Sequence, residues 1–377
     1  MANKHEQYAL KQRQSLPLEA KIILSNERLR QWFEYWDGEV YVSFSGGIDS
    51  TVLADLAARF CKRTGYKLYL LFVNTGLEYP EIQKFVKTFA EWLRNTYSID
   101  VQLDIVRPEI RFDEVLKTYG YPVISKEVSN TISGARNSIR KGVYSLRLCK
   151  LGVSREEYGG LYDSGEYDYD KSLEKSKFKQ TKWRYLLDAY FDSTSICCDV
   201  MKKNPSAKYE KQTGRKPIIA TMAEESMNRE IAWLKHGCNA FSAQKPKSTP
   251  MAFWKRQDVL HYIKKFCVPY CCVYGVIRVK QSEDTENEQI NMFDFLGCYE
   301  PEDTLETTGC DRTGCIFCMF GCHLEKEPNR FQRLKETHPR QYEYCINGGE
   351  MVDGKWQPNK EGLGLGYVLD YIGVKYE

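Results

Sequence analysis

The feature that most constrains this chain is a short glycine-containing segment, Ser45 to Ser50, with the sequence Ser-Gly-Gly-Ile-Asp-Ser. An apolar, β-prone run from Val40 to Phe44 precedes it. The run from Ser50 to Phe60 follows it and carries apolar residues at helical spacing. This order predicts a strand, a tight turn and the start of a helix, which is a layout that holds phosphate groups.

The residue types in this segment suit an anion and a metal ion together. Glycines let the backbone approach a phosphate closely, and the N–H groups of the helix start point toward it. Ser45, Ser50 and Thr51 add hydroxyl donors. Asp49 would repel a phosphate unless Mg²⁺ is bound beside it. An ordinary strand-to-helix turn is the alternative, and the segment is not a Walker A loop because it lacks Gly-Lys-Ser/Thr.

The elements that follow predict the fold class. Apolar strands at Lys67–Val73 and Asp100–Val106 flank a helix at Ile82–Tyr97, and Lys216–Thr221 is a fourth core strand. Strands that alternate with helices predict an α/β fold with a doubly wound parallel sheet. Ligands of such sheets bind beyond the carboxyl ends of the strands, where Asn74–Gly76 follows the second strand.

The complete Ser-Gly-Gly-x-Asp-Ser motif after a strand resembles the pyrophosphate (PP) loop of the ATP-pyrophosphatase superfamily. Over residues 38–320 the chain is similar to the PAPS (phosphoadenosine phosphosulfate) reductase family within it. The resemblance implies an adenine nucleotide alpha hydrolase-like, Rossmann-like fold, here with a Cys-rich C-terminal extension. Where those reductases carry Asp-Thr-Gly, this chain has Asn at the first position. The predicted nucleotide-binding residues are Ser43, Ser45, Gly46, Gly47, Asp49, Ser50, Thr51, Val73, Asn74, Thr75, Gly76, Lys126 and Arg229.

Fourteen cysteines and a polar N-terminus predict a reducing cytoplasm, where cysteines indicate metal binding or chemistry rather than disulfides. Cys315-x-x-Cys318 is a metal-type or redox-type pair, and Cys310 and Cys322 could complete a local site. A Cys-Cys pair followed far downstream by Cys-x-x-Cys resembles the cluster-bearing adenylyl-sulfate reductases. That resemblance implies a 4Fe–4S cluster next to the nucleotide. Zinc on an overlapping set and buried unliganded thiols are the alternatives. The predicted metal ligands are Cys197, Cys198, Cys315 and Cys318.

Two departures from the reductases bear on the reaction. The chain has no cysteine after Cys345 and lacks their Glu-Cys-Gly-(Ile/Leu)-His tail, whose cysteine attacks sulfur. Its PP loop is intact, which favours ATP with Mg²⁺. In both features the chain resembles the sulfur-transfer branch of the superfamily. We therefore expect it to cleave ATP to AMP and pyrophosphate and to support iron–sulfur-dependent sulfur transfer to an adenylated acceptor. Asp49 and Arg229 are the predicted catalytic residues.

Two other functions stay open. One is a reductase of PAPS or adenylyl sulfate whose thiol comes from a partner or from Cys345, and the other is a nucleotide-binding regulator without turnover. The expected partners are an adenine nucleotide, a sulfur donor such as a cysteine desulfurase, and a nucleic-acid acceptor. The net charge of +3 gives no strong nucleic-acid signal by itself.

The predicted organisation has three parts. Residues 1–37 form an N-terminal helical segment, residues 38–281 the PP-loop domain with a surface insertion at about 144–182, and residues 282–377 a Cys-rich region that packs on the core. A long helix is expected at Glu325–Tyr344. No run reaches about 18 apolar residues, so we expect a cytoplasmic protein without a membrane partner.

Overall fold

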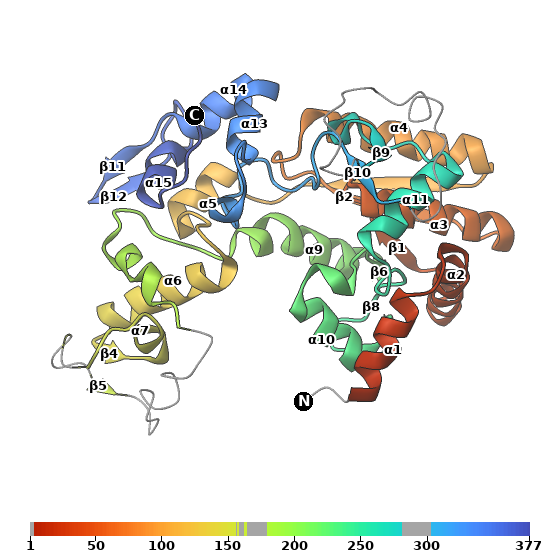
Figure 1. Cartoon of the computed structure of the whole chain (residues 1–377), viewed down its shortest axis with the longest axis horizontal. Coiled ribbons are helices and arrows are strands. Elements are labelled where there is room, and N and C mark those ends of the chain that lie inside the picture. The colour runs from red at the N-terminus through yellow and green to blue at the C-terminus, as the bar shows by residue number, and fades with distance from the viewer. Residues whose placement is uncertain (1–3, 156, 158–161, 164–178, 281–302) are drawn as a thin grey trace. The chain divides into compact units, whose positions relative to one another are not determined.

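The computed structural model describes residues 4–155, 157, 162–163, 179–280 and 303–377 (Figure 1). They form two compact units. The first unit contains the chain up to Arg107 together with Asn204–Gly314, and the second contains Pro108–Lys203 together with Cys315–Glu377. The predicted domain limits at residues 37 and 281 do not coincide with the limits of these units. Residue 281 falls outside the described residues. Those domains, and the insertion at 144–182 that is only partly described, stay predictions.

The first unit is built on a six-stranded sheet. All neighbouring strands run parallel except the last pair, which is antiparallel. The predicted α/β fold with a doubly wound parallel sheet is therefore confirmed, with one short antiparallel edge strand that the sequence did not indicate. The strand order is β3 (Val101–Val106), β2 (Leu68–Val73), β1 (Val40–Ser43), β6 (Lys216–Ile218), β8 (Lys247–Ser248) and β7 (Asn239–Ala240).

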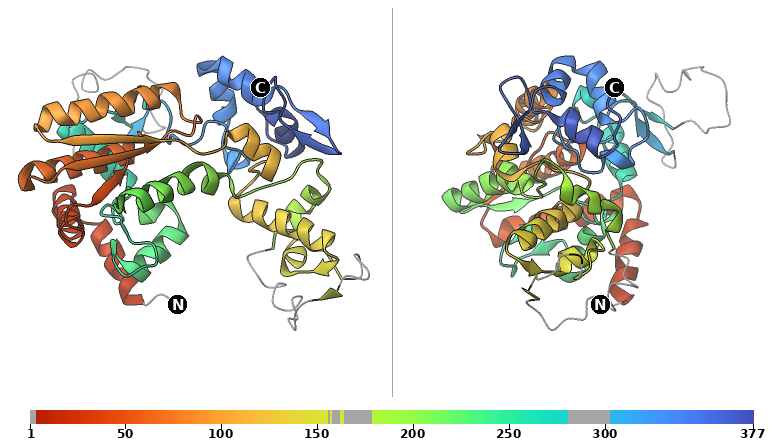
Figure 2. Two further views of the ribbon diagram at one scale, coloured as in Figure 1. Left: turned by 180° about the vertical axis from the view of Figure 1, so that it is seen from behind. Right: turned by 90° about the vertical axis from the view of Figure 1, so that its left-hand side faces the viewer.

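Alternating side chains of β1 face two different layers. Val40 and Val42 belong to the large core that includes helices α3 (Ile48–Thr64) and α4 (Pro80–Tyr97). Tyr41 points to the other face, where its ring meets Tyr209 of α9 (Asn204–Thr213) at a centroid distance of 5.2 Å. Figure 2 shows α4 and α9 on opposite sides of the sheet. The period of two along the strand thus buries both faces.

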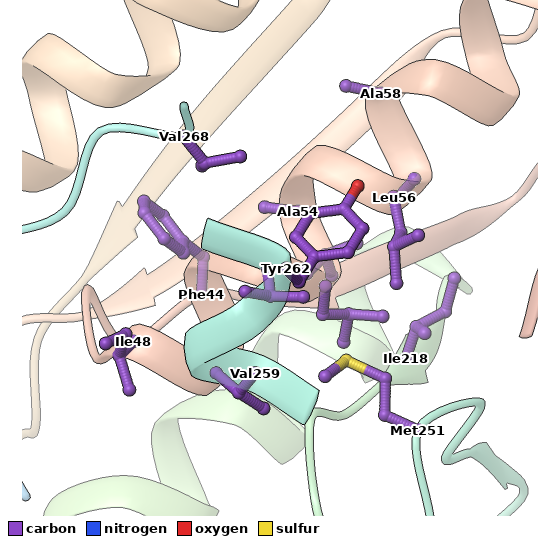
Figure 3. Close-up of a cluster of buried hydrophobic side chains, with 14 of the residues drawn as sticks. Phe44, Ile48, Ala54, Leu56, Ala58, Ile218, Met251, Val259, Tyr262 and Val268 are labelled. Atoms are coloured by element: carbon purple, nitrogen blue, oxygen red, sulfur yellow. The ribbon is translucent and has the colours of Figure 1, made fainter. Parts of the chain in front are cut away.

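Helices α2 (Leu18–Tyr35) and α11 (Arg256–Phe266) complete the large core. Figure 3 shows Tyr262 of α11 beside Ala54 of α3. The Tyr262 hydroxyl donates to the buried Asp55 carboxylate at 2.6 Å. This packing fixes the first residue of α11 near the start of α3. The remaining elements of this unit are α1 (Lys4–Gln14), η3 (Ala223–Glu225), α10 (Met227–His236), η4 (Cys272–Tyr274), β9 (Ile277–Val279) and β10 (Leu305–Thr307).

The second unit is mainly helical. The predicted single helix at 325–344 is wrong, because α13 ends at Thr337 and α14 begins at Pro339, a residue that cannot continue a helix. Its elements are α5 (Phe112–Tyr119), α6 (Lys126–Arg140), β4 (Val143–Tyr144), α7 (Leu146–Lys150), β5 (Tyr162–Asp163), η1 (Thr181–Asp188), η2 (Asp199–Lys203), η5 (Cys322–Leu324), α13 (Arg330–Thr337), α14 (Pro339–Ile346), β11 (Glu350–Val352), β12 (Lys355–Gln357) and α15 (Leu365–Tyr371).

The C-terminal segment packs within this second unit, where the Tyr121 hydroxyl donates to the Leu363 carbonyl at 2.9 Å. Across the described residues, no helix combines the length and the apolar character that crossing a membrane requires.

Candidate nucleotide site and candidate metal centre

The PP loop joins β1 to α3, as the sequence predicts, and its own hydroxyls brace it. The Ser45 N–H donates to Ser50 Oγ at 3.2 Å, and the Gly47 N–H donates to Ser45 Oγ at 3.3 Å. The Ser50 and Thr51 hydroxyls donate to the Gly47 carbonyl at 2.8 and 3.0 Å. The predicted phosphate-binding hydroxyls therefore also hold the loop in shape.

Gly46 is required by the backbone and by its neighbours. Its φ is +73°, and a Cβ there would lie 2.8 Å from Ile82 Cγ2 and 2.9 Å from Val86 Cγ2. Both side chains belong to α4. The loop is thus pressed against α4, and any other residue type would require the Ile82 and Val86 side chains to shift.

A second segment of the first unit packs on the loop, and the sequence did not indicate it. The Ile48 N–H donates to the Tyr274 hydroxyl at 3.0 Å, and that hydroxyl lies 2.8 Å from Thr313 Oγ1. Burial raises the pKa of Tyr274, so the phenol stays neutral. Tyr274 and Thr313 fix the start of α3 from outside the motif.

Three arginines surround Asp49. Arg256 Nη1 lies 3.2 Å from Asp49 Oδ1, while Arg256 Nη2 donates to the Asp311 carbonyl at 2.7 Å. Burial raises the pKa of Asp49, and the charges of Arg256, Arg312 and Arg229 oppose that shift. Asp49 thus shares its surroundings with three positive charges from three separate segments.

Glu225 balances two of these arginines. Its carboxylate pairs with Arg229 and lies 4.0 Å from Arg312 Nη2. The Glu225 side chain is only 8% exposed, whereas Arg312 is 66% exposed. Burial and the neighbouring Arg312 charge lower the pKa of Arg229. The Glu224 carboxylate also lies beside Arg256, whose backbone N–H donates to it, so three guanidinium groups face three carboxylates in this cluster.

A cavity of about 150 Å³ lies on one side of Arg229. Its lining includes Thr221 and Met222, which follow β6, together with Trp233 of α10 and Cys238. The cavity gives the Arg229 side chain room beside the carboxyl end of the sheet.

The predicted residues Val73 to Gly76 lie at the carboxyl end of β2, next to β1. They form a turn that is bonded internally. The Thr75 hydroxyl donates to Glu78 Oε1 at 2.7 Å, and the Gly76 N–H donates to Asn74 Oδ1 at 3.1 Å. The Asn74 side chain therefore supports the turn.

In the second unit, three chain segments meet around the predicted cysteines. Tyr121 forms a parallel bridge with Ser193, and Ile124 forms another with Phe320. Ile124 has a φ of +62°, a strained value for a β-branched residue. The bridges bring the Cys197–Cys198 segment and the Cys315–Cys318 segment to the same strand-like stretch.

The thiols of all four predicted ligands influence one another. The pKa of Cys197 is raised by its hydrogen bond with Cys198, by burial, and by the nearby Cys198, Cys318 and Cys315 thiols. The Cys197 hydrogen bond lowers the pKa of Cys198, and burial opposes this shift. The pair precedes the π-helical turn η2. Among the described residues, no three potential ligands already form a metal-binding group. The four thiols thus lie near one another without the geometry of a bound metal.

Positive charges surround these thiols. Lys126 and Lys202 help to lower the pKa of Cys198. Arg330 Nη1 donates to the Cys318 carbonyl at 2.8 Å. Lys126, predicted to contact phosphate, therefore lies beside Cys198 in the second unit, and its phosphate contact stays a prediction.

The other cysteines are placed differently. Cys310 belongs to the first unit, where its thiol lies 3.7 Å from the Tyr79 hydroxyl. The Cys322 thiol donates to the Met319 carbonyl at 2.9 Å. Cys345 is completely buried, and burial raises its pKa well above the ordinary value. The choice between the four predicted cysteines and a set with Cys310 or Cys322 stays a prediction.

The structure thus brings together two groups of predicted residues. The PP loop, the β2 turn and Arg229 lie in the first unit, and Lys126 and the four cysteines lie in the second. The sequence did not indicate Arg256 or Arg312. The Gly- and Thr-rich stretch around Arg312, between two cysteines, was a usable signal, whereas Arg256 has no surrounding pattern.

Residues 39–142 match the model of the phosphoadenosine phosphosulfate reductase domain, which confirms the predicted family resemblance over that segment. No curated protein matches the chain. Among solved structures, the chain is similar to NMN synthetase from Francisella tularensis, with 14% identity, a TM-score of 0.31, and coverage of 68% of this chain and 73% of that one. It is also similar to the U34-tRNA thiolase NcsA from Methanococcus maripaludis with its 4Fe–4S cluster, with 12% identity, a TM-score of 0.30, and coverage of 67% and 66%. At these identities and TM-scores, the similarity gives no information about function.

Proposed function

We propose that this chain binds ATP at the PP loop, cleaves it to AMP and pyrophosphate, and thereby supports sulfur transfer to an adenylated acceptor. The observation that carries the proposal is the charge arrangement around Asp49. A partly exposed carboxylate suits Mg²⁺, and arginine forks suit phosphate oxygens. Both stand at the start of α3, where the helix dipole also favours an anion.

In the proposed reaction, an acceptor oxygen attacks the α phosphorus of ATP. The bond from that phosphorus to the bridging oxygen breaks, and pyrophosphate carries the electron pair away. AMP stays attached to the acceptor oxygen and leaves with that oxygen when sulfur replaces it. Such transfers depend on positioning and on charge stabilisation, which the start of α3 and Arg229 would supply here. Asp49 would hold the Mg²⁺ that accompanies ATP.

The four cysteines fit a thiolate-bound metal group. Their thiols lie near one another, and the nearby Lys126 and Lys202 help to favour the thiolate form of Cys198, whereas the pKa values of Cys197 and Cys318 are raised. We propose that Cys197, Cys198, Cys315 and Cys318 hold a 4Fe–4S cluster, with zinc as the alternative. A bound cluster would supply a site for sulfur or for electrons. A nucleic acid is the proposed acceptor, and a cysteine desulfurase the proposed sulfur donor.

The position of Cys345 argues against the reductase alternative. That function requires a thiolate that can attack the sulfur of an adenylyl sulfate, and Cys345 was the candidate within this chain. Its side chain has no exposed surface, and burial opposes thiolate formation. A reductase would therefore need a thiol from a partner protein.

Pyrophosphate release from ATP tests the proposal directly. We expect the purified protein to release pyrophosphate with Mg²⁺, and Asp49→Ala to lower the rate by on the order of 100-fold. Asp100→Ala, at a side chain that is 68% exposed, is the matched control and should leave the rate unchanged. Unchanged release by Asp49→Ala would contradict the role of the loop. Sulfite release from PAPS with thioredoxin would identify a reductase, and nucleotide binding without either product would identify a regulator.

A further inference from the structure

The PP-loop motif does not explain why arginines from other segments lie beside Asp49. Arg256 begins α11 and Arg312 lies in the segment before Gly314, so both reach the loop from far along the chain. Each already has a protein oxygen as a partner, either on Asp49 or on Glu225. The charged groups of this cluster therefore pair with one another and are accessible to a ligand. Arg256 is a quarter exposed and Arg312 is two-thirds exposed.

We propose that Arg256 and Arg312, with Arg229, form a clamp for the two phosphates that leave ATP as pyrophosphate, and that Asp49 holds Arg256 in place until Mg²⁺ takes over this carboxylate. The inference rests on the proposed function, since it names residues and a ligand group for the same site. It assigns the clamp to a pyrophosphate group rather than to a sulfate.

The geometry around Arg256 supports an exchange of partners. Its Nη2 is anchored on the Asp311 carbonyl at 2.7 Å, and its backbone N–H donates to the Glu224 carboxylate. The guanidinium is thus fixed at one end, while its Nη1 rests on Asp49 at 3.2 Å. When a cation neutralises Asp49, Nη1 loses this acceptor and can bond a phosphate oxygen without moving its anchor.

The charges of the cluster match the proposed ligand. Asp49, Glu225 and Glu224 offset the three guanidinium charges, so the cluster alone attracts an anion only weakly. Once Mg²⁺ covers Asp49, all the positive charge around it can act on a ligand that carries several negative charges. The terminal sulfate of an adenylyl sulfate carries one negative charge and would use little of this arrangement.

Calorimetric titration with inorganic pyrophosphate tests the clamp. With Mg²⁺ present, we expect Arg256→Gln and Arg312→Gln each to weaken binding by at least about tenfold. Arg256→Lys should lie between wild type and Arg256→Gln, because it keeps the charge without the fork. Arg278→Gln, which removes an exposed arginine paired with Glu306 on the β9–β10 ribbon, should bind as wild type.

The same titration without Mg²⁺ separates the clamp from a purely structural role. Asp49→Asn should then bind pyrophosphate several-fold more tightly than wild type, because it removes a repelling charge and frees Arg256. In an Arg256→Gln background, Asp49→Asn should give a clearly smaller gain, because no Arg256 guanidinium is freed. A merely structural Arg256 would not couple to Asp49 in this way.

Each outcome decides between the two proposals. If wild type binds pyrophosphate and the Arg256 and Arg312 variants bind it equally well, the clamp is overturned, whether or not ATP is cleaved. Absence of pyrophosphate binding by wild type also overturns it. If the arginine variants lose binding and wild type releases no pyrophosphate from ATP, the clamp stands and the proposed reaction falls.

Discussion

Gly46 and Gly65 offer a matched test of steric demand at the residue scale. Both have positive φ, +73° and +79°, but only Gly46 has neighbours within 4 Å of a built Cβ, on Ile82 and Val86. Gly65→Ala should cost about 1–2 kcal/mol in the free energy of unfolding, from backbone strain alone. Gly46→Ala should cost about 1–3 kcal/mol more, because the Ile82 and Val86 side chains must shift. Urea denaturation measures both values, and equal losses would show that α4 does not press on the loop.

The thiols allow a second test at this scale. Cys198→Ser removes a predicted ligand, whereas Cys272→Ser removes an exposed thiol of the first unit. We expect Cys198→Ser to lose most of the bound iron and Cys272→Ser to keep it, as measured by iron and zinc assays after anaerobic purification. Colourless wild-type protein with stoichiometric zinc would show that the site holds zinc rather than a cluster. Full iron in Cys198→Ser would exclude Cys198 as a ligand.

Among the elements, the strand, loop and helix of the PP-loop motif were predictable because their signals are local. The run Val40–Phe44, the glycines and the helical spacing after Ser50 lie within one short stretch, and β1 and α3 form there. Arg256 was not predictable, because its partner Asp49 is 207 residues away and the pairing depends on how α11 packs. The four cysteines could be grouped by spacing, but the link between Ile124 and Phe320 that gathers their segments has no pattern in the sequence.

Arg136 holds the segment before the Cys197–Cys198 pair against α6. Its guanidinium donates to the carbonyls of Phe191 and Leu186 at 2.7 and 2.8 Å and to Asp192 at 3.3 Å. The side chain is 16% exposed, so its removal leaves buried acceptors without a donor. We expect Arg136→Ala to cost about 3 kcal/mol of local stability.

Arg140 is the control for this prediction, since it is exposed one turn further along α6. Hydrogen exchange of peptides from α6 and η1 should show faster opening in Arg136→Ala and unchanged opening in Arg140→Ala. Similar exchange in the two variants would mean that the carbonyls find other donors or that the contact adds little.

At the scale of the whole molecule, the chain crosses between the two units at Arg107–Pro108, Lys203–Asn204 and Gly314–Cys315. Neither unit is a continuous stretch, so no boundary read from composition could define them. Apart from Lys126, the residues of each candidate site nevertheless lie within one unit. The PP loop and its arginines belong to the first, and the four cysteines belong to the second. The two chemistries can therefore be disturbed one at a time.

Removal of the metal tests whether the two units are stable independently of each other. The four cysteines join segments that are far apart in the sequence, so a bound metal would cross-link the second unit and stabilise it. After chelation, we expect faster hydrogen exchange around Ser193–Lys203 and Cys315–Leu324, while β1, β2 and α3 keep their protection. Pyrophosphate affinity should also persist, because none of the clamp arginines lies in the second unit. If β1 and α3 lost protection together with the cysteine segments, the metal would be stabilising both units, and the assignment of the two sites to separately stable units would be wrong.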